Sequence, residues 1–235
     1  MRDTAEAATR HAILELVERD QVAIWWYNRL RPTRLAPDFA QAALPAGMAA
    51  WMAQRRRRTH HLLLPTDLPV ATIVALSALP DGGRPAIGAA AALDPRDAVR
   101  AATLELLQGE ITLAQMRAFS QMPDPPPPPP LFAWSQSTNL AALPELGAGA
   151  PFSDPPPPID FAHLLDHFAA HDIDIVTVDI TRPEFGIPVV KALSPQLRDW
   201  LPRFGPGRLY DVPVVLGLRD APLAETALNP TPFVI

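Results

Sequence analysis

The chain has 235 residues, of which 48% are hydrophobic and 19% are charged, and its formal net charge at pH 7 is −5. This length is enough for one substantial hydrophobic core, and the acidic balance argues against general nucleic-acid binding, which needs a basic surface. The sequence has no cysteine, which excludes disulfides, thiolate metal sites and cysteine nucleophiles.

The sequence also lacks the signals of a membrane protein or a secreted protein. No stretch has the roughly 18 uninterrupted apolar residues of a membrane span. Residues 1–6 do not lead into an apolar segment with a cleavage site. We therefore expect a soluble cytoplasmic protein that binds neither nucleic acid nor a membrane.

The first part of the chain predicts two helices followed by strands. The first helix is expected over residues 4–30, with Asp3 or Thr4 as its cap, and the second over residues 47–58. Strands and one turn-forming stretch follow; the strands are expected at residues 61–64, 69–76 and 86–93, and the turn at residues 80–84.

The later part of the chain mixes helices and strands. Asp94 as a cap and Pro95 at the first helical position predict a helix over residues 96–119, and another is expected over residues 159–171. Strands are expected at residues 173–180, 187–193 and 212–216. The order indicates an α+β fold of mixed β-sheets packed against long helices, without the regular βαβ alternation of a doubly wound fold.

Between these parts lies a proline-rich segment at residues 124–158. It contains six consecutive prolines at residues 125–130 and four more at residues 155–158. Polyproline is stiff and cannot pair in a sheet, so we interpret the segment as an exposed insertion or linker. A partner-binding role is the alternative to a simple spacer.

Four arginines, Arg55 to Arg58, end the second predicted helix. Cations in a last helical turn complement the helix dipole, so the simpler interpretation is a solvated helix end. The alternative is a patch that binds phosphate or peptide.

Three histidines, His163, His167 and His171, are spaced four residues apart on a predicted helix. The outer two are about 12 Å apart along the helix axis, so all three cannot bind one ion. A two-histidine site remains open, but a solvated polar face is the simpler interpretation.

The most informative cluster is Glu15, Glu18 and Arg19 in the first predicted helix. At about 100° per residue, Glu18 lies about 60° to one side of Glu15 and Arg19 about 40° to the other. Two acids so close repel each other, so a cation is wanted there, either Arg19 alone or Arg19 plus a metal. The simpler interpretation is a surface ion pair between Glu15 and Arg19, worth a few tenths of a kcal/mol.

If the protein binds a nucleotide, it must use side chains, because the sequence has neither a Walker-type loop nor a dinucleotide fingerprint. Carboxylates holding Mg²⁺ on the phosphates are the most plausible means, and Glu105 is a further candidate. Trp25 and Trp26 are either core aromatics or a base-stacking platform, and the core interpretation is the simpler one.

The first predicted helix contains AILELVERD at residues 12–20, followed by VAIWWYN at residues 22–28. This run resembles the signature helix of the YcaO family, and more narrowly that of its thiazole/oxazole-forming peptide cyclodehydratases. Three further segments agree with the same family, in the expected order: residues 98–108, residues 181–191 leading to 205–213, and residues 228–233. The resemblance covers nearly the whole chain.

The resemblance implies a function and a site. Enzymes of this kind use ATP and Mg²⁺ to cyclise Cys, Ser or Thr residues of a ribosomal precursor peptide to azolines, by phosphorylating a backbone amide oxygen during bacteriocin and related biosynthesis. By position, Glu15, Glu18 and Glu105 would hold Mg²⁺ and the ATP phosphates. Arg19 would face phosphate charge as a cofactor-binding and catalytic residue.

The resemblance further implies that residues 1–235 are the C-terminal portion of a YcaO domain whose N-terminal half is absent here. Expected partners are the precursor peptide, a leader-peptide-binding protein and a flavin-dependent azoline dehydrogenase, and the expected assembly is a homodimer. The alternative function is a truncated, non-catalytic scaffold or peptide-binding component of the same family.

Overall fold

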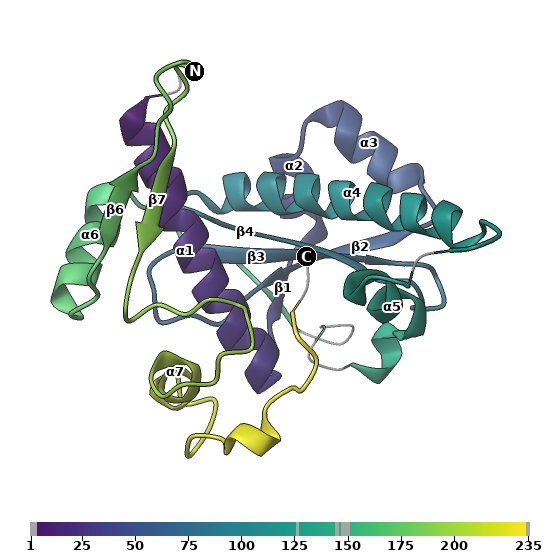
Figure 1. Cartoon of the computed structure of the whole chain (residues 1–235). Coiled ribbons are helices and arrows are strands. Elements are labelled where there is room, and N and C mark those ends of the chain that lie inside the picture. The colour runs from purple at the N-terminus through teal and green to yellow at the C-terminus, as the bar shows by residue number, and fades with distance from the viewer. Residues whose placement is uncertain (1–3, 126, 144–145, 147–150, 234–235) are drawn as a thin grey trace.

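A five-stranded mixed sheet with helices on both faces forms the centre of the molecule (Figure 1). This computed structural model describes residues 4–125, 127–143, 146 and 151–233. The strand order is β4-β3-β2-β1-β5, and the strands are β1 (Thr33–Leu35), β2 (Arg58–Leu63), β3 (Ala71–Ala78), β4 (Ala86–Ala92) and β5 (Phe152–Ser153). All neighbours are antiparallel except β1 and β5. The predicted α+β class is confirmed.

The two faces of the sheet are covered by different helices. Alternate residues of a strand face opposite sides, and β3 is buried along its whole length. On one face, Val74 and Leu76 pack in the cluster that contains residues of α1 (Ala5–Asn28) and α7 (Arg208–Val215). On the other face, Ile73 packs in the cluster that contains residues of three further helices: α2 (Pro37–Ala43), α3 (Ala46–Gln54) and α4 (Pro95–Ser120).

The caps of the two long helices agree with the sequence patterns. Thr4 accepts a hydrogen bond from the N–H of Ala7 and begins α1. Asp94 accepts one from the N–H of Arg96 and begins α4, with Pro95 at its first position. Both predicted starts are confirmed because each cap bonds a backbone group within its own first turn.

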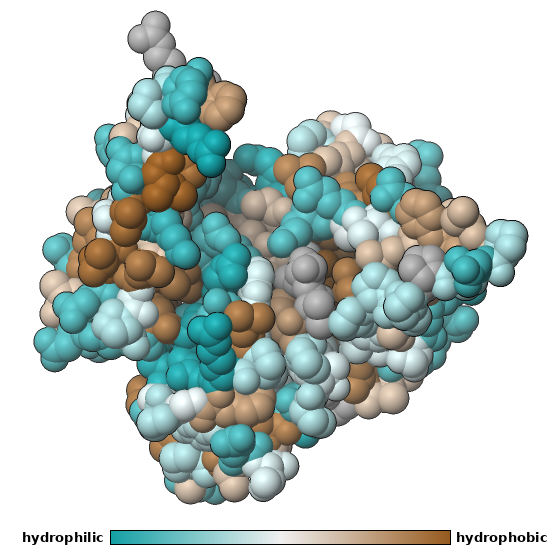
Figure 2. Space-filling view, in the orientation of Figure 1, coloured by the Kyte–Doolittle hydropathy of each residue, from teal (hydrophilic) through white to brown (hydrophobic). Residues whose placement is uncertain are grey.

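A smaller lobe packs beside the first half of α1. It consists of α6 (Phe161–Ala170) and the antiparallel pair β6 (Val176–Asp179) and β7 (Val190–Leu193). Leu164 and Phe168 of α6 pack in a buried cluster with Val17 of α1. Figure 2 shows apolar surface over this lobe, where Val176 is 56% exposed.

Residues 212–216 were expected to be a strand, and this prediction is wrong. They lie in and directly after α7, which contains Pro213. The β-branched valines favour a strand locally, but Leu209 and Val212 bury one face of a helix against the core formed with α1. Tertiary packing therefore overrides the local preference.

The interpretation of the four arginines as a solvated helix end is also wrong. The helix α3 ends at Gln54, and the strand β2 begins at Arg58. Arg55 donates to Glu110 of α4 at 2.6 Å, and Arg57 donates to the same carboxylate at 3.1 Å. Arg55 and Arg57 thus join this segment to α4, whereas Arg56 and Arg58 are exposed.

The proline-rich segment differs in part from the predicted exposed linker. Its middle contains the helix α5 (Pro130–Ser137), in which Phe132 and Ser135 are buried, and a short 3-10 turn (Leu140–Ala142). Its later part contains β5, which pairs with β1. Polyproline itself does not pair, but the residues between the two proline runs do.

The helix α4 approaches the strand β4 closely at Gly88, and this contact sets the position of Glu105 beside β4. A Cβ atom at this position would lie 2.2 Å from the backbone nitrogen of Leu106 and 2.5 Å from the carbonyl oxygen of Ala102. Only glycine fits there, because backbone atoms of a helix cannot move aside as a side chain can.

None of the helices in the described residues is long and apolar enough to span a bilayer.

Gly88→Ala should therefore lower the free energy of unfolding by about 3 kcal/mol, measured by urea denaturation. Gly47→Ala is the matched control, because nothing lies within 4 Å of a Cβ atom added there. Alanine in this helical position should leave stability unchanged or raise it by up to about 1 kcal/mol. Equal stability of both variants would contradict the close approach.

Candidate functional site

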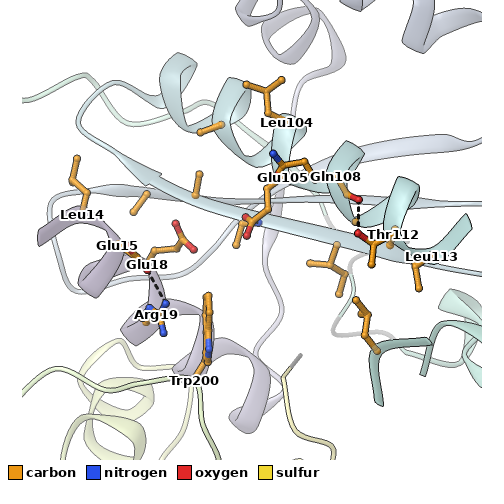
Figure 3. A pocket seen from close by; sticks show the side chains of 18 of the residues that line it. Leu14, Glu15, Glu18, Arg19, Leu104, Glu105, Gln108, Thr112, Leu113 and Trp200 are labelled. Atoms are coloured by element: carbon orange, nitrogen blue, oxygen red, sulfur yellow. Dashed lines mark hydrogen bonds and ion pairs between the residues drawn. The ribbon is translucent and has the colours of Figure 1, made fainter. Parts of the chain in front are cut away.

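A cavity of about 980 Å³ lies between α1 and α4, beside β4. Side chains from both helices line it, together with small residues of β4, the start of α5 and Trp200 (Figure 3). Glu15, Glu18, Arg19 and Glu105 all line this one cavity. Their roles as cofactor ligands stay a prediction.

Arg19 is held in place from several sides. Its guanidinium donates to Glu15 at 2.7 Å and lies 3.7 Å from a carboxylate oxygen of Asp199. It also lies over the ring of Trp200, at 4.3 Å from the ring centroid. Stacking on an aromatic face fixes the plane of the guanidinium and leaves its edge for hydrogen bonds.

Glu105 and Glu18 reach the free edge of β4 from the two helices. The N–H of Ala89 donates to Glu105 at 2.7 Å, and the N–H of Ala91 donates to Glu18. In Figure 3 the side chains of Glu18 and Glu105 extend toward each other across the cavity. The edge of the sheet thus brings together acids that are far apart in the sequence.

The two carboxyl groups have shifted pKa values. Burial, followed by the negative charges of Glu105 and Glu15, raises the pKa of Glu18 from 4.5 to about 8, although the N–H of Ala91 and Arg19 oppose the shift. Burial also raises the pKa of Glu105, with the N–H of Ala89 opposing it. Both shifts favour the protonated acids, and a bound cation would stabilise the charged carboxylates in place of the protons.

The donor set fits Mg²⁺ held jointly with phosphate. Mg²⁺ prefers carboxylate oxygens and usually binds through one or two of them together with substrate phosphates and water. Within the described part of the chain, no three His, Cys, Asp or Glu side chains are placed to hold a metal ion by themselves. As placed here, no more than two of Glu15, Glu18 and Glu105 would contact one ion, and phosphate and water oxygens would complete its coordination.

A family model described as YcaO cyclodehydratase, ATP- and Mg²⁺-binding, matches residues 2–198. The chain belongs to the YcaO family. ATP and Mg²⁺ are the cofactors of this family. A comparison with curated protein sequences found no match.

Solved structures agree with this membership. A heterocyclase in complex with substrate and cofactor is 31% identical with a TM-score of 0.81, and the alignment covers 98% of this YcaO chain and 32% of the other. The heterocyclase TruD is 30% identical with a TM-score of 0.82, and the alignment covers 100% of this chain and 33% of TruD. The chain thus spans about a third of the length of both heterocyclases. YcaO from Methanopyrus kandleri bound with AMPPCP and Mg²⁺ has a similar fold, at 20% identity, a TM-score of 0.58, and coverage of 84% and 54%.

Sequence reasoning missed a second polar group of this YcaO chain, next to the cavity. Asp20 is fully buried and accepts hydrogen bonds from the backbone N–H of Arg198 at 2.9 Å and from Arg208 at 2.7 Å. Arg208 also donates to Asp67, at 2.7 Å. The available signal was a charged residue directly before the apolar run that begins at Val22.

This buried group positions the segment that holds Arg19. The bond from Asp20 to the backbone of Arg198 fixes the chain directly before Asp199 and Trp200. Tyr27 adds a second anchor, since its hydroxyl donates to the carbonyl oxygen of Trp200 at 2.6 Å. The contacts around Arg19 therefore depend on residues that do not line the cavity.

Other candidates from the sequence lie outside the cavity. Trp25 and Trp26 are buried in the core, so the core interpretation is confirmed and the base-stacking platform is wrong. The rings of His167 and His171, at the end of α6, stack on each other with their centroids 4.0 Å apart, and neither residue lines the cavity. A two-histidine metal site stays a prediction.

The raised pKa of Glu18 should make folding stability depend on pH. Between about 4.5 and about 8 the folded protein keeps a proton that the unfolded chain has released. The free energy of unfolding should therefore fall as pH rises through this range, by up to about 1.4 kcal/mol per pH unit from this group. Urea denaturation at several pH values should show that the free energy of unfolding of Glu18→Gln falls less over this range than that of the unaltered protein. Parallel profiles for the two proteins would contradict the shift.

Removal of Arg208 should be strongly destabilising because it leaves the charge of Asp20 buried and unpaired. Arg208→Met is expected to lower the free energy of unfolding by about 3–5 kcal/mol in thermal or urea denaturation. Arg100→Met is the control, since Arg100 forms an exposed ion pair with Asp97 and should cost less than about 1 kcal/mol. A similar small cost for both would show that the buried group contributes little.

Proposed function

We propose that this chain carries one wall of the Mg-ATP site of a peptide cyclodehydratase. The observation that carries the proposal is the pair Glu18 and Glu105, two partly buried acids at the edge of β4 with raised pKa values in one cavity. Such a pair is suited to a divalent cation and its phosphate ligand. The family and the two heterocyclases of similar fold support this proposal.

The proposed reaction cyclises Cys, Ser or Thr residues of a ribosomal precursor peptide to azolines. The side-chain heteroatom attacks the preceding carbonyl carbon and loses its proton. The amide oxygen takes the γ-phosphoryl group of ATP and leaves as phosphate, and the amide nitrogen loses its proton as the C=N bond forms. Bound ATP would supply the phosphoryl group and Mg²⁺ would neutralise its charge. The net products are the azoline, ADP and phosphate.

The residues of this chain would bind and orient the reacting groups. Glu15, Glu18 and Glu105 would hold Mg²⁺ and the ATP phosphates together, with phosphate oxygens completing the coordination, and Glu18 would release its proton when the cation binds. Arg19 would bind phosphate oxygens, and its stacking on Trp200 limits the orientations that its N–H groups adopt. Phosphoryl transfer depends on such positioned charges more than on covalent chemistry.

The expected partners follow from the same proposal. They are a precursor peptide, a leader-peptide-binding protein and a flavin-dependent azoline dehydrogenase, and the expected assembly is a homodimer. These stay predictions, as does the assignment of residues 1–235 to the C-terminal portion of a longer YcaO domain.

The nucleotide site is tested by calorimetric titration of the chain with a non-hydrolysable ATP analogue and Mg²⁺. Glu18→Gln should weaken binding at least about tenfold, because the variant cannot supply the negative oxygen that the cation needs. Glu6→Gln is the matched control on the same helix, since Glu6 is exposed and pairs only with Arg10 among the described residues. Equal affinity of both variants would contradict the assigned role of Glu18.

Catalysis is tested with ATP, Mg²⁺ and a candidate precursor peptide, with the remaining part of a YcaO domain supplied where needed. The peptide should lose the mass of one water per ring, and one phosphate should be released for each. Peptide binding without nucleotide binding or mass loss would favour the alternative, a non-catalytic scaffold or peptide-binding component.

A further inference from the structure

Beyond the carboxylates, the cavity continues along α4. Four of the residues that line it, Glu105, Gln108, Thr112 and Met116, follow at intervals of three or four and so share one helix face. At a rise of about 1.5 Å per residue, Met116 lies about 16 Å beyond Glu105 along the helix axis. Figure 3 shows this course from Glu105 past Gln108 and Thr112 to Leu113. The cavity therefore has a charged end and a distant second end.

The second end, which we call the aliphatic arm, is lined by residues of α4, β4 and α5: Ala86, Leu113, Met116, Pro129, Pro130 and Leu131. Met116 and Leu131 pack against the buried cluster that contains Phe132. Thr112 adds a hydroxyl, but this group donates to the carbonyl oxygen of Gln108 in its own helix at 3.0 Å. The start of α5, in the proline-rich segment, is thus part of the cavity wall.

We propose that the aliphatic arm binds an apolar side chain of the peptide substrate, four or five residues away from the residue that is cyclised. This inference rests on the proposed function, which puts the reacting amide near the carboxylates. An extended peptide advances about 3.3 Å per residue, so the 16 Å between Glu105 and Met116 corresponds to about five residues. The arm would then select precursor peptides by a residue outside the new ring.

The adenine base of ATP is the competing occupant. A base carries ring nitrogens and an amino group that lose hydrogen bonds to water on burial and need replacements. The described residues that line the arm include no aromatic ring, and the neighbouring hydroxyl of Thr112 uses its proton within its own helix and so offers the ring nitrogens no donor. An aliphatic side chain loses no hydrogen bonds there and gains from removing its surface from water.

The test uses peptides that contain one cysteine and one leucine in an otherwise Ser/Gly/Asn sequence. The leucine is moved one residue at a time, from two to seven positions away on either side. Affinity for the 235-residue chain is measured by fluorescence anisotropy, with an ATP analogue and Mg²⁺ present. The leucine peptide should bind best at four or five positions on one side, about tenfold or more tighter than its asparagine counterpart. A flat profile, including no detectable binding, would overturn the proposal.

Two variants of α4 locate the effect. Met116→Lys should abolish the preference for leucine and leave the affinity for the ATP analogue unchanged. Ile111→Lys is the matched control, because Ile111 is 60% exposed on the same helix and does not line the cavity. Weaker binding of the ATP analogue to Met116→Lys, with the leucine preference kept, would assign the arm to the base and overturn the proposal.

A crosslinking measurement on the unaltered chain tests the proposal without requiring that any variant folds. A peptide with photo-leucine at the best position should crosslink to Leu113, Met116 or Leu131, as read by mass spectrometry, and crosslinks elsewhere would contradict the proposal. If the unaltered chain keeps the leucine preference but does not bind the ATP analogue, the proposed function fails and the peptide arm stands. The two failures are thus distinguishable.

Discussion

The backbone N–H groups of Ala89 and Ala91, at the free edge of β4, are bound by carboxylates of two helices that cover opposite faces of the sheet. An edge strand exposes backbone donors that need partners. The helices α1 and α4 are separated by the sheet itself, so their side chains meet only beyond its edge. The contacts that satisfy the edge of β4 therefore also bring Glu18 and Glu105 together.

This arrangement disfavours the charged form of Glu18 in the free protein. Burial and neighbouring acids favour the protonated form of Glu18, and Arg19 relieves little of this because it also contacts Glu15 and Asp199. Cation binding would displace the proton and stabilise the charged carboxylate. The site thus departs from what stability alone favours, as functional sites often do.

One turn of α1 connects the site to three parts of the fold. Glu18 faces the edge of β4, Arg19 faces Trp200, and Asp20 faces Arg208 of α7. Successive residues of a helix point about 100° apart, so three neighbours contact three different elements. The fully buried Asp20 fixes the rotation of the helix, because a slight turn would remove its carboxylate from Arg208.

The α+β class, the long helices with their caps, and the cluster of Glu15, Glu18 and Arg19 are predictable from local sequence, because caps and helix-face spacing depend on nearby residues. Three further features follow from tertiary contacts alone: residues 212–215 are helical, Arg55 and Arg57 bind Glu110, and the start of α5 lines the cavity. The proximity of Glu18 and Glu105 also depends on tertiary contacts, since it requires α4 to approach β4 at Gly88. These outcomes depend on contacts between segments far apart in the chain, and no local pattern encodes which distant backbone will bury a valine, pair an arginine or face a carboxylate.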